Sequence, residues 1–265
     1  MLKVSELFIY PVKSLAGIAV TEAVVTDRGL QHDRRWMLVD EHNRFLSQRE
    51  LPQMALFDVE ITGSGLHIKH RFNAENIDFP FQPVTNEVLN VVVWDDTFPA
   101  VTVSAEADAW FTRLLGLKCR LVYMPDEAHR PVDPEYAINQ EIVSMADGYP
   151  FLLIGQSSMD DLNSRLEQPV LINRFRPSIV FTGGYPYQED ELKHFTINDI
   201  DFYGVKPCAR CNVPAIDQYS GRIGKEPVKT LARYRRRNNK VYFGQNLIHH
   251  GAGSIHIGDT ISLGS

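Results

Sequence analysis

The hexapeptide KPCARC, residues 206–211, contains two of the three cysteines in this 265-residue chain. Cys208 and Cys211 are flanked by the cations Lys206 and Arg210. Cysteine attacks substrates or binds metals as its thiolate, and neighbouring positive charges favour that form. We therefore predict that the chemistry of this protein is centred on the hexapeptide.

Three kinds of site use the Cys-x-x-Cys spacing: a structural zinc site, a thiol–disulfide centre, and a site where one thiolate binds another metal. Structural zinc needs about four nitrogen or sulfur ligands, and Cys119 is the only other cysteine. A thioredoxin-like centre begins a helix after a strand, whereas Pro214 begins no long helical pattern. Two cysteines used as small apolar residues are a further alternative. The residues alone leave these interpretations open.

The rest of the chain has the pattern of a mainly β (α+β) protein. Short runs rich in β-branched and aromatic residues are separated by Gly, Pro, Asn and Asp, which is typical of strands. The predicted strands are 3–10, 19–26, 35–40, 55–61, 65–69, 88–94, 117–124, 178–182, 194–205, 240–248 and 254–263. The predicted helices are 105–115, with Ser104 as its cap and Gly116 at its end, 158–166, capped by Ser157 or Ser158, and 227–235.

The pattern restarts after Gly116, and a chain of this length often forms two modest domains. We therefore predict domains at 1–116 and 117–265. Residues 125–150 are rich in proline and charge, and a loop of this length is often functional. We expect this loop to cover a site.

Composition excludes several classes of protein. Hydrophobic residues at 44% and charged residues at 23% are typical of a soluble globular protein. A net charge of −6 and a pI near 5.8 argue against a nucleic-acid-binding protein. Without a signal-peptide pattern, a long apolar span or an even set of cysteines, we expect a cytoplasmic protein with no membrane contact.

Cations recur where loops meet strands. Lys13 and Ser14 follow the first strand, Arg34 precedes another, and Arg174 and Arg176 precede a third. Each alone fits a solvated surface residue. Together they fit the binding of an anionic phosphate group, for which Arg offers forked hydrogen bonds.

Six motifs in order extend the pattern across nearly the whole chain. They are YPVKS (10–14), HDRRWMLVD (32–40), FLLIGQSSMDDLNSRL (151–166), NRFRPSIV (173–180), KPCARC (206–211) and FGQNL (243–247). This set resembles the MOSC-domain proteins, and in particular the branch of the mitochondrial amidoxime-reducing component and its bacterial relatives.

The resemblance implies a β-rich N-terminal domain and a C-terminal MOSC β-barrel that bind a pterin molybdenum cofactor between them. It implies that Cys211 is the metal ligand and the catalytic residue, and a soft thiolate suits such a metal. It also implies the residues that hold the cofactor, which are Lys13, Ser14, Arg34, Ser158, Arg174, Arg176 and Arg210. We further expect Asp33 to orient Arg34, Asn173 to position the loop before Arg176, and Arg210 to favour the Cys211 thiolate.

The reaction implied for this branch is the two-electron reduction of small N-hydroxylated substrates to amines or amidines. An iron–sulfur domain of the kind some relatives carry needs four cysteines, so we expect electrons from a separate electron-transfer protein. The cluster Arg233 to Arg237 fits either a docking patch for an acidic carrier or an ordinary solvated helix end. Two alternative functions remain: a persulfide carrier for metal–sulfur centres, and a cofactor-binding or storage protein.

Overall fold

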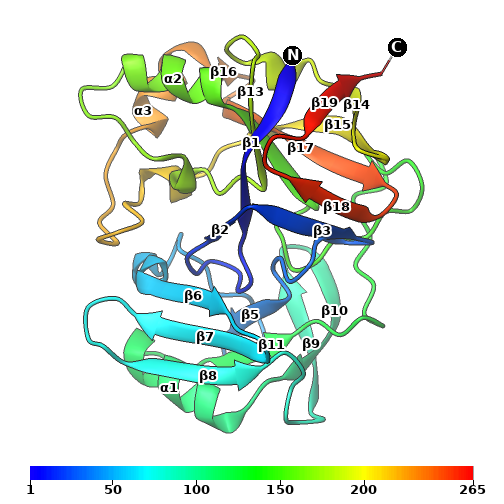
Figure 1. The fold of residues 1–265 in the computed structure, drawn as a ribbon. Coiled ribbons are helices and arrows are strands. Elements are labelled where there is room, and N and C mark those ends of the chain that lie inside the picture. The colour runs from blue at the N-terminus through cyan, green and yellow to red at the C-terminus, as the bar shows by residue number, and fades with distance from the viewer. Residues whose placement is uncertain (265) are drawn as a thin grey trace.

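The computed structural model describes residues 1–264 and shows a mainly β protein with two β-rich halves (Figure 1). The strands are β1 (Leu2–Ile9), β2 (Ile18–Val20), β3 (Glu22–Thr26), β4 (Gly29–Leu30), β5 (Trp36–Val39), β6 (Phe57–Ile61), β7 (Gly65–His70), β8 (Asn76–Pro80), β9 (Val88–Val93), β10 (Asp96–Thr102), β11 (Arg120–Tyr123), β12 (Phe151–Gly155), β13 (Ile179–Thr182), β14 (His194–Ile197), β15 (Ile200–Ala209), β16 (Arg236–Arg237), β17 (Lys240–His250), β18 (Gly253–His256) and β19 (Thr260–Leu263). The α-helices are α1 (Ala105–Leu115), α2 (Gln156–Ser164) and α3 (Val228–Tyr234).

The upper half in Figure 1 is a closed β-barrel. Its strands follow the order β12-β13-β1-β19-β14-β15-β17, and β17 pairs back with β12 to close the ring. Only β12 and β13 are parallel among these neighbours. Buried aromatic side chains fill the interior, including Phe151, Phe195 and Phe202. Closure leaves none of the seven strands with an open edge along its paired length.

The lower half contains two smaller sheets, β5-β11-β10-β9 and β6-β7-β8. Helix α1 packs against them through Phe111, which contacts Phe57 in the core. The Ser104 hydroxyl accepts a hydrogen bond from the Ala107 N–H at 3.1 Å, and Gly116 ends the helix at φ 72°. The predicted bounds and caps of this helix are confirmed.

The sheets cross the sequence boundary between the halves. β1 pairs with β13 and β19, and β3 pairs with β18, so the first strands lie among those of the C-terminal barrel. The predicted domain boundary at Gly116 therefore stays a prediction, because strands from both sides of it belong to the same sheets. Because β1 leads directly into residues 10–14, its position in the barrel places that motif at the junction of the two halves.

Several predicted elements differ from the structure. Residues 194–205 form the hairpin β14–β15, with Asn198 at φ 54° in its turn, and residues 254–263 form the two strands β18 and β19. Strands β8, β10 and β12 were not predicted. Helix α2 begins at Gln156, directly after β12, and its N-cap is Gly155 without a side-chain cap. The predicted cap at Ser157 or Ser158 is wrong because the helix starts before both residues.

Residues 125–150 contain no named helix or strand, as the proline and charge pattern predicts. The Glu141 carboxylate accepts hydrogen bonds from the N–H groups of Ile138 and Asn139, and Val132 and Val143 are buried. The loop is thus ordered by its own contacts.

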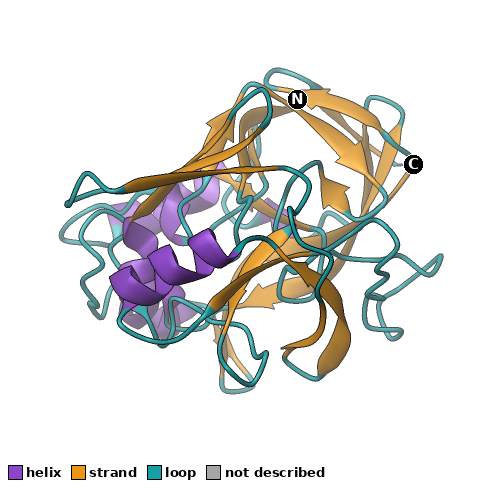
Figure 2. Ribbon diagram, turned by 90° about the horizontal axis from the view of Figure 1, so that it is seen from below, coloured by secondary structure: helices purple, strands orange, loops and turns teal. Residues whose placement is uncertain are grey.

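The helices lie to one side of the strands in Figure 2, and none within residues 1–264 has the length and apolarity to span a membrane.

We expect Phe202→Ala to destabilise the barrel strongly. Phe202 is fully buried and its ring contacts those of Phe195 and Phe151 at centroid distances of 5.5 and 5.2 Å. Removing a buried aromatic ring costs about 3–5 kcal/mol. Chemical denaturation measures the free energy of unfolding, and Leu171→Ala, at a 73% exposed side chain, is the control that should change it by about 0.5 kcal/mol or less.

Candidate functional site

A cavity of about 1040 Å³ lies at the junction of the two halves and is lined by residues of both. Its lining carries one carboxylate, Asp147, and eight cations: Lys13, Arg34, Arg49, Arg176, Lys206, Arg210, Arg237 and Lys240. The protein as a whole is acidic. Concentrating positive charge in one cavity of an acidic protein favours an anionic ligand.

Three residues of the cavity lining adopt backbone conformations that non-glycine residues rarely take. Ser14, Arg34 and Arg176 have φ values of 70°, 49° and 56°. Such residues carry local strain that the surrounding structure must hold, and they concentrate at functional sites. All three line the cavity.

The ring of Tyr10 holds two of the guanidinium groups together. Tyr10 is 1% exposed, and the Arg34 and Arg176 guanidinium carbons lie 4.3 and 4.2 Å from the ring centroid. Burial raises the pKa of Tyr10 to about 12, so the phenol stays neutral at physiological pH. The ring therefore gathers two like charges through cation–π contacts without neutralising either.

Asp33 orients Arg34 as expected. Its buried carboxylate accepts a 2.6 Å hydrogen bond from Arg34 Nη1 and a 2.8 Å bond from the Tyr10 N–H. Arg34 Nη2 also donates to the backbone carbonyl of Arg176 at 3.4 Å. Asn173 supports the same turn through its backbone carbonyl, which accepts from the Arg176 N–H.

The fold pairs only part of the Arg176 guanidinium with hydrogen-bond acceptors. Its Nη1 donates to the Leu15 carbonyl at 2.7 Å, whereas Nη2 is buried without a partner among residues 1–264. Burial lowers the pKa of Arg176 to about 10. A buried hydrogen-bond donor without a partner destabilises the fold. An anion placed against Nη2 would accept a hydrogen bond from it and would favour the charged form of Arg176.

Lys13 and Arg49 share the single carboxylate of the cavity. Lys13 Nζ and Arg49 Nη2 lie 2.6 and 2.9 Å from the two oxygens of Asp147. Enclosure opposes ionisation of Asp147, but the charges of Lys13 and Arg49 outweigh it and hold the pKa of this carboxyl well below its usual range. Burial lowers the pKa of Lys13 to about 8 despite Asp147. Lys13 is therefore charged below that pH, and one carboxylate is shared between its charge and that of Arg49.

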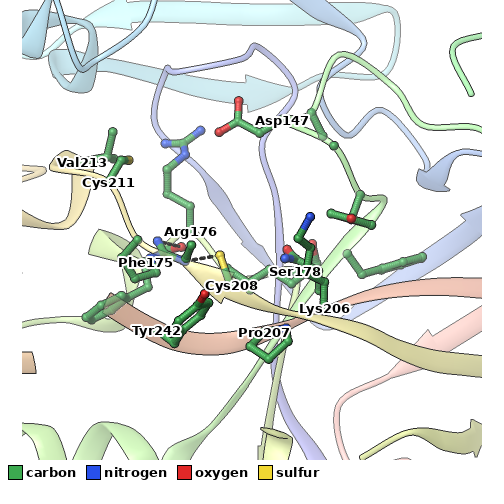
Figure 3. A pocket seen from close by; sticks show the side chains of 18 of the residues that line it. Asp147, Phe175, Arg176, Ser178, Lys206, Pro207, Cys208, Cys211, Val213 and Tyr242 are labelled. Atoms are coloured by element: carbon green, nitrogen blue, oxygen red, sulfur yellow. Dashed lines mark hydrogen bonds between the residues drawn. The ribbon is translucent and has the colours of Figure 1, made fainter. Parts of the chain in front are cut away.

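The cysteine motif begins within an irregular stretch of strand β15. The register of β15 against β17 shifts between Gly204 and Lys206 and again between Pro207 and Ala209. Bulges of this kind redirect side chains beside functional sites. In Figure 3, Cys208 and Lys206 lie on one side of the cavity and Asp147 lies across from them.

The two cysteines have different cationic neighbours. Arg210 Nη1 donates to Cys208 Sγ at 3.1 Å and Nη2 donates to the Phe175 carbonyl. The side chain of Arg210 thus pairs with Cys208, and the expectation that Arg210 favours the Cys211 thiolate stays a prediction. Burial acts to lower the pKa of Arg49, but Asp147 and then Cys211 outweigh burial and raise it, and Arg49 and Cys211 both line the cavity.

Two predicted cofactor-binding residues lie outside this cavity. The Ser158 hydroxyl is fully buried, donates to Glu189 at 2.7 Å and accepts from the Tyr187 N–H. Arg174 forms a 2.7 Å ion pair with Asp217. Ser158 faces the interior because α2 starts earlier than predicted, and the side chain of Arg174 is engaged by Asp217, which does not line the cavity.

Lys13, Ser14, Arg34, Arg176, Arg210 and Cys211 are brought together as predicted, because all six line the same cavity. The sequence interpretation missed Tyr10, Arg49 and Asp147. Tyr10 stands in the YPVKS motif and Asp147 in the loop expected to cover a site, so both had a signal. Arg49 has none, because it lies in a segment without a motif.

Comparison with known proteins agrees with this architecture. One family model, the MOSC N-terminal beta barrel domain, matches residues 1–118, and a second, the MOSC domain, matches residues 140–262. The human mitochondrial amidoxime-reducing component 1 is 31% identical over 279 residues, covering 98% of this chain and 82% of the human protein. The chain belongs to the MOSC-domain family.

Other relatives of this MOSC protein fall into two groups. The mouse mitochondrial amidoxime-reducing component 1 is 30% identical over 278 residues, covering 98% of this chain and 82% of the mouse protein. A molybdenum cofactor sulfurase of Oryza sativa subsp. japonica is 30% identical over 260 residues, covering 90% of this chain but 31% of that protein. Both groups connect the chain with a function related to the molybdenum cofactor.

We expect the affinity of the cavity for inorganic phosphate to fall as pH rises through about 8. Lys13 is protonated below its pKa of about 8 and neutral above it, while phosphate is already a dianion there. Calorimetric titration across this range measures the effect. In Lys13→Met the affinity should be lower and should not change at pH 8; a pH dependence that survives in this variant would assign it to another group.

Proposed function

We propose that this protein binds the molybdenum–pterin cofactor in the cavity, with Cys211 as the protein ligand of the metal. The observation that carries the proposal is Nη2 of Arg176, which is buried without a partner among residues 1–264 in a cavity that Arg34, Lys13 and Cys211 also line. These cations fit the terminal phosphate of the cofactor. A soft thiolate fits a metal already held by sulfur ligands.

The donor set argues against a structural zinc site. Within residues 1–264 no three His, Cys, Asp or Glu side chains gather where they could hold a metal ion. Cys119 is buried in the lower half, away from the cavity lining. One protein thiolate can complete the coordination of a metal that brings its other ligands with it, which is the situation that the pterin cofactor provides.

We propose further that the protein reduces N-hydroxylated substrates. The reaction takes R–NHOH, two electrons and two protons to R–NH₂ and water, with the electrons supplied by a separate electron-transfer protein. The bound cofactor would supply the two-electron redox chemistry. The chain would anchor the anionic end through Lys13, Arg34 and Arg176, and Arg49 would balance negative charge at Cys211.

The loop of residues 125–150 would limit access of water to this site. Tyr136 lies under Lys206, with Nζ 4.1 Å from the ring centroid, and Asp147 contacts Lys13 on the other side. These contacts fix the loop against both the hexapeptide and the first motif. A partly enclosed site strengthens the interactions that orient a charged ligand.

The sulfurase relative supports a second candidate, a persulfide carrier. Cys208 and Cys211 are both free, partly exposed and in the cavity. In this function one of them would hold an additional sulfur supplied by another protein. Metal content distinguishes the two candidates, because the carrier needs no bound molybdenum.

We expect Cys211→Ala to lose molybdenum and Cys208→Ala to keep it. Protein purified from a host that makes the cofactor should contain near one equivalent of molybdenum, and loss of the only protein ligand should reduce it by about tenfold or more. Elemental analysis and pterin release measure metal and cofactor separately. Pterin retained equally in both variants without metal would instead support storage, and a mass gain of one sulfur without molybdenum would support the carrier.

Removing either Lys13 or Arg176 should weaken cofactor retention while Cys211 is intact. Each charge-assisted hydrogen bond contributes about 1.5–3 kcal/mol, so Lys13→Ala and Arg176→Ala should each lower the pterin content after dialysis by about tenfold or more. Arg174→Ala is the matched control, because Arg174 pairs with Asp217 outside the cavity. Equal loss in all three variants would refute the assigned phosphate site.

A further inference from the structure

A basic surface adjoins the cavity where β16 and β17 meet. Residues 228–240 contain six Lys or Arg and no Asp or Glu, although the chain has 33 acidic and 27 basic residues. Five of these cations are exposed, and we call them the basic rim: Lys229, Arg233, Arg236, Arg237 and Lys240. Such a local reversal of charge creates a field that attracts an acidic partner.

The basic rim is little used by the fold itself. Arg235, the sixth cation, is the structural member: it is paired with Asp190 at 2.6 Å and stacked on Tyr187. Arg237 lies at a longer 3.4 Å from the same carboxylate. The other four rim cations form no ion pair within residues 1–264. An ordinary helix end does not explain a row of cations without partners that continues into a hairpin.

The basic rim adjoins the part of the cavity that contains the cysteine motif. Arg237 and Lys240 line the cavity while remaining exposed to solvent. The Arg210 N–H donates to the Val241 carbonyl at 2.7 Å, so the segment that leads to Cys211 lies directly beside the start of β17. In Figure 1, α3 and β16 lie at the same end of the barrel.

We propose that the basic rim is the docking surface for an acidic electron-transfer protein, which delivers electrons to the cavity across the β16–β17 hairpin. The partner follows from the proposed reductase function, on which this inference rests, and its acidity follows from the charge of the rim. Electron transfer weakens steeply with distance, and this hairpin is an exposed segment hydrogen-bonded to the cysteine motif. Complementary charge would mainly speed association and fix orientation.

The test is binding of an acidic [2Fe–2S] ferredoxin to the double variant Lys229→Glu/Arg233→Glu. Both residues lie four apart on α3 and outside the cavity lining, so cofactor content should not change. We expect the dissociation constant to rise about tenfold or more at an ionic strength of about 0.02 M, and the difference to shrink at about 0.2 M. Calorimetry measures binding without requiring turnover.

The matched control is Lys69→Glu/Lys118→Glu, which makes the same change in net charge at exposed residues of the lower half. Its ferredoxin affinity should fall less than about twofold, because both changes lie on the lower half, away from the proposed docking surface, and alter only the general field of the protein. Equal weakening in both double variants would overturn the proposal. So would tighter binding of the unchanged protein to phosphatidylserine vesicles than to ferredoxin, which would assign the rim to a lipid surface.

Activity assays separate failure of this inference from failure of the proposed function. With a reduced dye as electron source, Lys229→Glu/Arg233→Glu should reduce a hydroxylamine at the unchanged rate, and with ferredoxin it should be slower by about tenfold. Dye-driven activity without ferredoxin binding refutes the docking role of the basic rim alone. Rim-dependent ferredoxin binding in a protein that reduces no N-hydroxylated substrate refutes the reductase function alone.

Discussion

One buried tyrosine ring holds two positive charges that would otherwise repel each other. Arg34 and Arg176 are separated by 142 residues in the chain, yet both guanidinium groups contact Tyr10. Each desolvated cation–π contact contributes about 2 kcal/mol, and Asp33 compensates only Arg34. The arrangement is stable because the surrounding sheets hold it, and it leaves Arg176 available to an anion.

The crossing of β1 into the C-terminal barrel is what makes this cluster possible. β1 pairs with β13, and β13 follows the turn that carries Arg176. Residues 10–14 leave β1 at the junction, where Lys13 and Ser14 line the same cavity as Arg176. The anion site is therefore assembled only when the N-terminal strand has joined the barrel, so folding of the barrel and formation of the site are coupled.

The sequence could predict the residues whose motifs coincide with element ends. Lys13, Arg34 and Arg176 were identified because each stands where a loop meets a strand, and the helix at 105–115 because Ser104 and Gly116 mark both of its ends. Ser158 was misplaced by local reasoning: the apolar run of β12 continues directly into α2, so the helix begins without a polar cap. The contact of Arg49 with Asp147 joins a segment without a motif to a long loop, and no local pattern encodes that pairing.

The two cysteines show why spacing alone was ambiguous. Identical residues three positions apart acquire different neighbours, because the β15 bulge separates Cys208, which accepts a hydrogen bond from Arg210, from Cys211 beyond the end of the strand. Arg49 lines the same cavity as Cys211 and is tied through Asp147 to Lys13. These ion pairs connect Arg49 with Lys13 of the first motif, on the lining that also carries Cys211. Any ligand in the cavity would meet positive charge from both halves of the protein, and the one carboxylate of the lining, Asp147, holds Lys13 and Arg49 in place.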